Sequence, residues 1–153
     1  MRFENKVVIV TGAAGGIGAA TARRFGAEGA RLVLADYDEA GVNSAADALR
    51  QGGVHDVLAL RCDVGAESDV AAAVEVACAR FGRLDVVVNN AGVMIFKPIE
   101  AHTEDDLLRV LKVDLGGAFW FTKHAFLRCA PGSAIVLIAA ERVSDSSAAF
   151  AAA

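Results

Sequence analysis

The sequence is poor in the features that mark membrane, secreted and nucleic-acid-binding proteins. No apolar run approaches the roughly 18 uninterrupted residues that a membrane span needs, because Gly, Asp and Asn interrupt the apolar stretches. The first ten residues carry no long apolar segment before a small-residue cleavage site, so we expect no secretory signal. Lysine and arginine form no run and the net charge is −4, so we expect neither nucleic acid nor a membrane as a partner.

Cysteine is also scarce. The three cysteines are odd in number and widely spaced, so they form neither an obvious disulfide framework nor a metal-ligand pair. The three histidines lie on different predicted elements and do not share metal-ligand spacing. We therefore predict a reduced, cytoplasmic protein without a metal site. The residues concerned are Cys62, Cys78, Cys129, His55, His102 and His124.

Short apolar runs alternate with helical stretches along the whole chain. The runs are continuous rather than alternating, which is typical of parallel strands covered on both faces by helices. The pattern predicts one doubly wound α/β domain over residues 1–153, whose ligands bind beyond the carboxyl ends of the strands. Predicted strands are 6–10, 31–35, 57–62, 84–88 and 133–140, and predicted helices are 16–28, 39–51, 67–81 and 103–127.

The most informative stretch is VIVTGAAGGIGAA, in which glycines follow the first strand and open the first helix. Gly12, Gly16 and Gly18 fall where side chains would obstruct a diphosphate that approaches the backbone. The helix N-terminus offers unpaired N–H groups and a partial positive charge to phosphates. Strand before, helix after and an acidic residue about 20 positions on together favour a dinucleotide site.

That acidic residue is Asp36, at the end of LVLAD. A carboxylate here can accept hydrogen bonds from both hydroxyls of an adenosine ribose and would repel a 2′-phosphate. No arginine or lysine follows Asp36, because the next residues, DYDEA, are acidic. The alternative is an ordinary surface aspartate that caps the next helix; the context favours the ribose role and hence NAD over NADP.

Two motifs carry a family resemblance. TGAAGGIG (residues 11–18) matches a TGxxxGxG pattern, and NNAG (residues 89–92) follows the fourth strand. Together they resemble the short-chain dehydrogenase/reductases over residues 3–153. The resemblance implies a Rossmann-type fold that lacks the family's C-terminal strands and binds a nicotinamide dinucleotide. It also implies oxidoreductase activity, with hydride transfer between the nicotinamide and an alcohol or carbonyl substrate.

The resemblance also implies which residues hold the cofactor. Asp63 and Val64 would border the adenine, Asn90 would approach a ribose, and residues 89–92 would shape the loop beside the nicotinamide. Gly15 lacks the basic side chain that is common there in NADP users. The full set of implied cofactor-binding residues is Gly12, Ala14, Gly15, Gly16, Ile17, Gly18, Asp36, Asp63, Val64, Asn90, Ala91 and Gly92.

The catalytic positions of the family depart from its pattern. Active members use a tyrosine, a lysine four residues later, a strand-five serine and a helical asparagine. The only tyrosine of this chain is Tyr37, and the residue four later is Gly41. By position, Phe150 takes the place of the tyrosine, Ala140 that of the serine and Asp114 that of the asparagine. Phenylalanine has no proton to donate, and losing a general acid lowers the rate by about 10²- to 10⁴-fold.

Three hypotheses stay open at this point. The first is an oxidoreductase whose sequence is incomplete or altered near its catalytic end, the second a catalytically inactive NAD-binding or protein-interaction module, and the third a nonfunctional fragment. The helix over residues 103–127, which we expect to be capped by Thr103, is nearly apolar all round. Such a helix must be buried on more than one side, so we expect a homo-oligomer through this helix or a covering segment.

Overall fold

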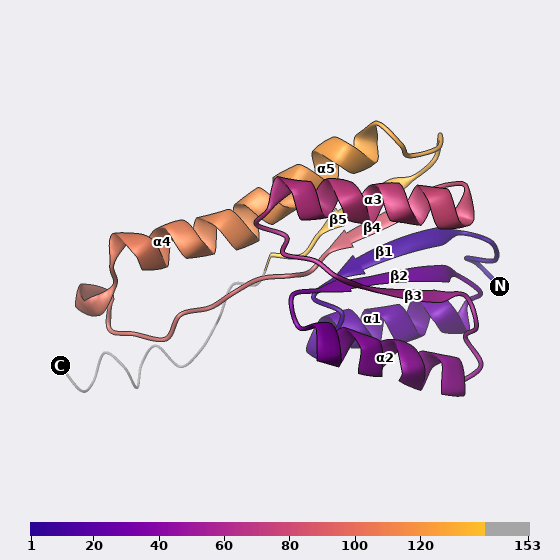
Figure 1. Ribbon diagram of the computed structural model, residues 1–153, viewed down its shortest axis with the longest axis horizontal. Coiled ribbons are helices and arrows are strands. Elements are labelled where there is room, and N and C mark those ends of the chain that lie inside the picture. The colour runs from indigo at the N-terminus through magenta and orange to yellow at the C-terminus, as the bar shows by residue number, and fades with distance from the viewer. Residues whose placement is uncertain (140–153) are drawn as a thin grey trace.

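The computed structural model describes residues 1–139, in which five parallel strands alternate with helices (Figure 1). The fourth and fifth strands are shorter than predicted, and the predicted helix over 103–127 consists of three consecutive segments. The elements are β1 Val7–Thr11, α1 Gly16–Ala27, β2 Arg31–Asp36, α2 Glu39–Gln51, β3 Val57–Arg61, α3 Glu67–Phe81, β4 Val86–Asn89, the 3₁₀ turn η1 Ile99–Ala101, α4 Glu104–Val110, the π-helical segment η2 Leu111–Gly116, α5 Gly117–Phe126 and β5 Ala134–Leu137.

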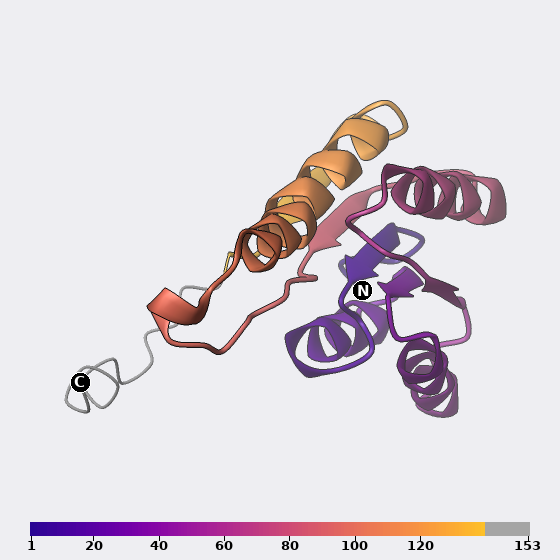
Figure 2. The same cartoon turned by 60° about the vertical axis from the view of Figure 1, so that its left-hand side comes forward.

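The sheet is parallel throughout, with the strand order β3-β2-β1-β4-β5. Helices α1 and α2 cover one face and α3 and α5 cover the other, as Figures 1 and 2 show. This is the predicted doubly wound α/β fold of the Rossmann type. From β1 the chain proceeds outward to β2 and β3, and then returns to the other side of β1 for β4 and β5. The order therefore reverses between β1 and β4, where such folds form a crevice.

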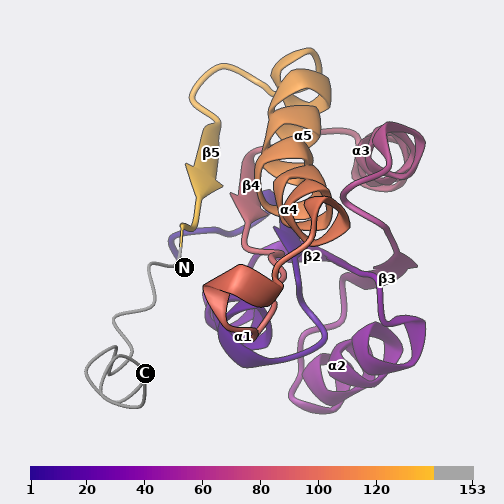
Figure 3. The same ribbon diagram turned by 90° about the vertical axis from the view of Figure 1, so that its left-hand side faces the viewer.

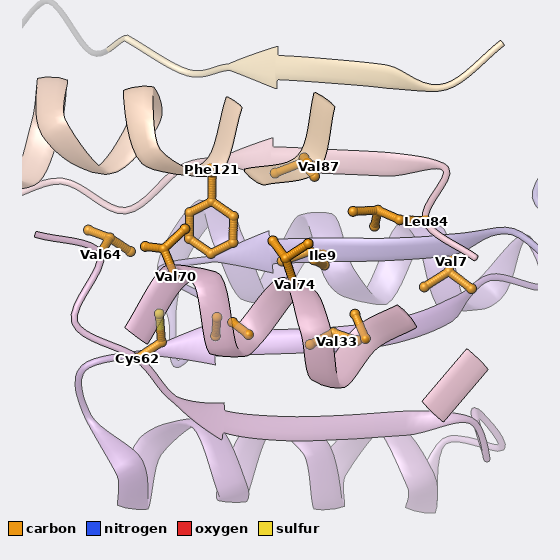
Figure 4. Close-up of a cluster of buried hydrophobic side chains, with 14 residues drawn as sticks. Val7, Ile9, Val33, Cys62, Val64, Val70, Val74, Leu84, Val87 and Phe121 are labelled. Atoms are coloured by element: carbon orange, nitrogen blue, oxygen red, sulfur yellow. The ribbon is translucent and has the colours of Figure 1, made fainter. Parts of the chain in front are cut away.

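The apolar runs form strands because helices bury both of their faces. Val7, Val8, Ile9 and Val10 of β1 are all fully buried, and β-branched side chains suit an extended backbone. Their side chains point alternately to the two faces and join two separate clusters. The cluster under α3 and α5 is centred on Phe121, which packs among aliphatic side chains of the strands and α3 (Figure 4). This buried sheet is a rigid support for the loops at its carboxyl edge.

The long helix begins with a capping box. The Thr103 hydroxyl accepts a hydrogen bond from the Asp106 backbone N–H, and the Asp106 carboxylate accepts one from the Thr103 N–H. The predicted cap is therefore confirmed. The chain continues without a break through η2, and such π-helical segments occur frequently at functional sites. Helix α4 projects beyond the carboxyl edge of the sheet, together with the segment over residues 90–103 (Figure 1).

Most apolar side chains of α4, η2 and α5 are exposed in this chain. Gly117, Phe121 and Ala125 are buried against the body of the domain, and the single tryptophan, Trp120, packs beside Phe119 at 5.0 Å between ring centroids. The expectation that this helix is buried on more than one side is thus not met within residues 1–139. None of the helices described there is long and apolar enough to cross a membrane. The exposed residues are Leu107, Leu108, Leu111, Leu115, Phe119, Phe126 and Leu127.

Candidate functional site

Two adjoining hollows lie at the carboxyl edge of the sheet, the end that faces the viewer in Figure 3. The first pocket, of about 600 Å³, lies between the ends of β2 and β3 and the α4–η2 helix. The second pocket, of about 490 Å³, lies between the ends of β4 and β5 and the start of α5. Val64 and residues 90–93 line both pockets, so one elongated ligand can occupy the two together.

The glycine loop leaves no room for side chains where β1 turns into α1. Gly12 has a φ of +63°, and a Cβ atom there would lie 2.8 Å from the Asn90 side-chain nitrogen. A Cβ atom on Gly18 would overlap the carbonyl oxygen of Gly12. Gly15 precedes α1 in an extended conformation, and no side chain within residues 1–139 caps that helix. The free helix N-terminus therefore lies beside bare backbone, which is the arrangement that binds a diphosphate.

Thr11 joins the loops that follow β1 and β4. Its hydroxyl oxygen accepts hydrogen bonds from the backbone N–H groups of Asn90 and Ala91, both at 2.9 Å. The Asn90 side-chain amide donates in return to the carbonyl oxygens of Thr11, at 3.0 Å, and Gly12, at 3.3 Å. Asn90 thus lines both pockets, and its amide nitrogen holds the two loops together. The sequence motif includes Thr11, but the sequence analysis gave it no role.

Asp36 lies at the first pocket with both carboxylate oxygens held. One oxygen accepts a hydrogen bond from the Ala14 N–H and the other from the Asp38 N–H, each at 2.9 Å. The cap of α2 is Asp38, whose side chain accepts from the Gly41 N–H at 3.0 Å. The alternative in which Asp36 caps this helix is therefore wrong. Each carboxylate oxygen has a second lone pair, so Asp36 can still accept from a ligand in the pocket.

The end of β3 supplies the other wall of the first pocket. The Asp63 carboxylate accepts a hydrogen bond from the Gly65 N–H at 2.9 Å, which fixes the turn that contains Val64. Cys62 is also among the residues of this pocket, but its side chain is buried in the core, and burial, with the nearby carboxylates of Asp69 and Asp63, raises the pKa of its thiol to about 12. A thiol with so high a pKa is not a nucleophile near neutral pH. Asp63 and Val64, which the family resemblance assigns to the adenine, both line this pocket.

Helix α4–η2 closes the first pocket with residues that sequence reasoning missed. Arg109, Lys112 and Val113 all line the pocket. The Lys112 side chain packs so closely over the turn at Gly65 that a Cβ atom on residue 65 would lie 3.0 Å from Lys112 Cγ. The apolar helix pattern indicated only an interface, because the sequence does not show which turn of a helix overhangs the sheet edge.

The second pocket contains the helical position at which the family has asparagine. The Asp114 carboxylate, on η2, accepts a hydrogen bond from the Val93 N–H at 2.8 Å and so holds the 90–93 segment in place. The buried side-chain amide of Asn89 has no hydrogen-bond partner in the described part of the chain. Ala140 and Phe150, the other two altered catalytic positions, lie outside the described residues.

Comparisons with known proteins identify this arrangement. Residues 6–152 match the family model described as short chain dehydrogenase. The chain belongs to the short-chain dehydrogenase family. Momilactone A synthase of Oryza sativa subsp. japonica is 45% identical over 149 residues, which are 95% of this chain and 53% of that protein. Meso-2,3-butanediol dehydrogenase of Serratia marcescens is 40% identical over 82% of this chain and 49% of that protein.

Solved structures of short-chain dehydrogenases share the fold. One from Brucella melitensis, described as a glucose/ribitol dehydrogenase, superimposes with a TM-score of 0.83 at 35% identity, covering 88% of this chain and 57% of that one. One from Mycobacterium smegmatis gives a TM-score of 0.79 at 40% identity, covering 83% and 53%. The chain therefore spans about half the length of the relatives it matches. Membership of the short-chain dehydrogenases implies NAD or NADP as cofactor, and the bare glycine loop beside the α1 N-terminus fits such a dinucleotide.

Proposed function

We propose that this chain is the dinucleotide-binding part of an NAD-dependent oxidoreductase that acts on a small alcohol or carbonyl compound. The observation that carries the proposal is the glycine cradle of Gly12 and Gly18 beside the free N-terminus of α1, with Asp36 at the adjoining pocket wall. Backbone atoms and a helix terminus are suited to a diphosphate, and the carboxylate is suited to a ribose.

Each wall of the two pockets has a part in this function. The backbone over residues 12–18 binds the diphosphate, and the remaining lone pairs of Asp36 accept hydrogen bonds from the ribose hydroxyls. Asp63 and Val64 border the adenine in the first pocket, and residues 90–93 direct the nicotinamide half into the second. The nicotinamide, when bound, supplies or accepts the hydride. Asp36 would repel a 2′-phosphate, which favours NAD over NADP.

A second candidate function is an NAD-binding module that does not turn over a substrate. Tyr37 is the only tyrosine of the sequence, and it lines the first pocket, at the end where we place the adenosine rather than the nicotinamide. One carboxylate oxygen of Asp114 accepts a hydrogen bond from the Val93 N–H, and this oxygen is therefore already engaged by the backbone of the protein. The residues described here hold a cofactor without offering it a tyrosine proton donor, and this observation favours a binding role for the chain by itself.

We also propose that the chain forms a homo-oligomer through the exposed apolar surface of α4, η2 and α5, and that it is cytoplasmic. Leu115 and Phe119 are each more than half exposed on this surface, and apolar patches of this kind mark interaction sites. Leu115→Glu with Phe119→Glu should then lower the mass measured by analytical ultracentrifugation. An unchanged mass would exclude this surface as the interface.

Calorimetric titration of the 153-residue chain with NADH and NADPH tests the cofactor proposal. We expect NADH to bind more tightly than NADPH, and Asp36→Ala to weaken NADH binding by about tenfold, because hydrogen bonds to a charged group are lost. Asp47→Ala is the matched control, since Asp47 is an exposed aspartate of α2 that pairs only with Arg50 among the described residues. Equal binding of NADH to wild type and Asp36→Ala would contradict the assignment of Asp36.

A panel of carbonyl compounds then separates the two functions, because the oxidoreductase consumes NADH and the binding module does not.

A further inference from the structure

A basic residue lies next to Asp36, although none follows it in the sequence. Asp36 ends β2 and Arg61 ends β3, and the two are partners in the parallel register of these strands. Partners in neighbouring strands project to the same face of a sheet. The structure therefore brings Arg61 beside Asp36, and its guanidinium contacts the ring of Tyr37, a residue that lines the first pocket.

Arg61 is only loosely engaged by the protein. Its guanidinium lies 3.3 Å from one carboxylate oxygen of Asp69, and that oxygen already accepts the Asp63 N–H at 3.0 Å. The Arg61 side chain is 46% exposed, and exposed ion pairs of this kind contribute little free energy. The guanidinium also lies 5.0 Å from the centroid of the Tyr37 ring, which lines the pocket. Because a guanidinium has five N–H donors, it keeps donors for a further anion.

Asp36 itself occupies a position suited to an anion. Two backbone N–H groups, those of Ala14 and Asp38, converge on its carboxylate. Converging N–H groups bind anionic oxygens in general, and a phosphate offers the same kind of acceptor. Two further carboxylates, Asp63 and Asp69, lie close by, so the corner as a whole is negatively charged and a 2′-phosphate enters against repulsion.

We propose that Arg61 is a second determinant of the choice between NAD and NADP. Asp36 repels a 2′-phosphate and accepts the ribose hydroxyls, whereas Arg61 attracts the phosphate and limits how strongly NADP is rejected. This inference rests on the proposed function, because it concerns the same adenosine pocket. It adds a residue that is distant from Asp36 in the sequence and lies beside it only because β2 and β3 pair.

The test compares two nucleotides that differ only in the 2′-phosphate. Calorimetry gives the dissociation constants of 2′-phospho-ADP-ribose and ADP-ribose, and their ratio measures discrimination against the phosphate. Arg61→Ala should raise this ratio about tenfold, because a charge-assisted hydrogen bond to the phosphate is lost. Arg61→Lys keeps the positive charge, so its ratio should stay close to the wild-type value. Arg80→Ala is the matched control: Arg80 also lies 5.0 Å from an aromatic ring centroid, that of Phe81, but it is in the last turn of α3, whereas the first turn of α3 contacts Asp63 at the pocket wall. It should leave the ratio unchanged.

A second pair of variants shows whether a change in the ratio comes from Arg61 itself or from impaired folding of the Arg61→Ala protein. Asp36→Ser should lower the ratio, and adding Arg61→Ala to Asp36→Ser should raise it again by about tenfold. If the ratio is unchanged in Arg61→Ala and equal in the two Asp36→Ser proteins, Arg61 has no part in the choice, while the cofactor proposal stands. If the wild-type chain binds neither nucleotide, the proposed function itself is wrong and this inference falls with it.

Discussion

The two ends of the sheet use the same kind of residue for opposite purposes. At the amino end the carboxylate of Asp85 is buried and accepts hydrogen bonds from the Val7 N–H at 3.0 Å, the Lys6 ammonium at 3.1 Å and the Arg83 guanidinium at 2.7 Å. At the carboxyl end Asp36 accepts hydrogen bonds from two backbone N–H groups and lines an open pocket. The amino end is closed by its own partners, whereas the carboxyl end leaves acceptors and bare backbone available.

The difference teaches how the fold separates stability from function. Asp85 orders the start of β1 and β4 by joining Val7 to Arg83, so its interactions are intramolecular. The carboxyl end holds its loops through Thr11 and Asp114, and these contacts fix the pocket walls without filling the pocket. We therefore expect substitutions at the amino end to change stability and those at the carboxyl end to change binding.

Asp85→Ala should have the largest effect. It leaves a buried N–H on Val7 and the two cations without their common acceptor, so the free energy of unfolding should fall by about 3 kcal/mol, while the affinity of the folded protein for NADH stays the same. Urea denaturation measures the first quantity and calorimetry the second. Asp47→Ala, on the surface of α2, should lower the stability by less than about 0.5 kcal/mol. Equal losses of unfolding free energy in the two variants would show that Asp85 does not stabilise the amino end of the sheet.

Gly18→Ala should act at the carboxyl end of the sheet, where it should lower the affinity for NADH. The added Cβ would overlap the Gly12 carbonyl oxygen and lie 2.8 Å from the Asn90 side-chain nitrogen, so the cradle must widen. We expect NADH affinity to fall at least about 100-fold, because misplacement of about an ångström is costly in a preformed site. Gly116→Ala is the control: its backbone is helical and its Cβ would come no closer than 3.6 Å to another residue, which is an ordinary contact, so affinity should hardly change. If both variants bind NADH equally well, the glycine loop is not where the diphosphate binds.

Thr11→Val should produce a smaller, mixed effect. The N–H groups of Asn90 and Ala91 lose their shared acceptor, which should lower the free energy of unfolding by about 1–2 kcal/mol and weaken NADH binding by about tenfold. Thr11→Ser keeps the hydroxyl, so it should retain most of the stability and most of the NADH affinity of the wild type. Thr122→Val removes an exposed hydroxyl that donates to the Ala118 carbonyl oxygen within α5, and it should leave binding unaltered. Loss of stability alone would assign Thr11 to the fold and not to the site.

The smallest expected effect is the pH dependence of the stabilisation that Asp85 provides at the amino end of the sheet. Burial by itself would raise the pKa of Asp85, but the hydrogen bonds from Arg83, the Val7 N–H and Lys6 outweigh it and hold the pKa below its usual 3.8. The stabilisation is therefore present above pH 4 and is lost as the pH falls through the lower pKa of the folded state. The stability difference between wild type and Asp85→Asn should thus shrink by about 1 kcal/mol between pH 6 and pH 3 in urea titrations. A constant difference would show that folding does not lower the pKa of Asp85.

Local sequence pattern predicted the regular parts of the fold. Helices α2, Glu39–Gln51, and α3, Glu67–Phe81, have the predicted bounds, because a polar start and a glycine after the last turn mark each of them. The strands follow from continuous apolar runs. The π-helical segment η2 was not predicted, since apolar residues around the whole helix conceal a change of hydrogen-bond register.

The site was predicted where a motif is contiguous and missed where it depends on packing. Gly12, Gly18 and Asp36 belong to short sequence patterns; Gly12 and Asp36 line the first pocket, and Gly18 packs against the backbone of Gly12. Arg61 comes beside Asp36 only through the register of β2 and β3, and Arg109 and Lys112 reach the pocket only because α4 overhangs the sheet. Pairing between strands and the direction of a helix are set by tertiary structure, so no local pattern contains them.

The single tyrosine and the single tryptophan give the molecule two natural optical reporters. Tyr37 stands at the rim of the first pocket against Arg61, so a nucleotide that enters should alter its ultraviolet absorbance and emission. Trp120 lies on α5 between Phe119 and the ammonium of Lys123, whose nitrogen is 5.3 Å from the ring centroid. Its fluorescence should therefore follow the docking of that helix, so ligand entry and unfolding can be monitored in unlabelled protein at two different wavelengths.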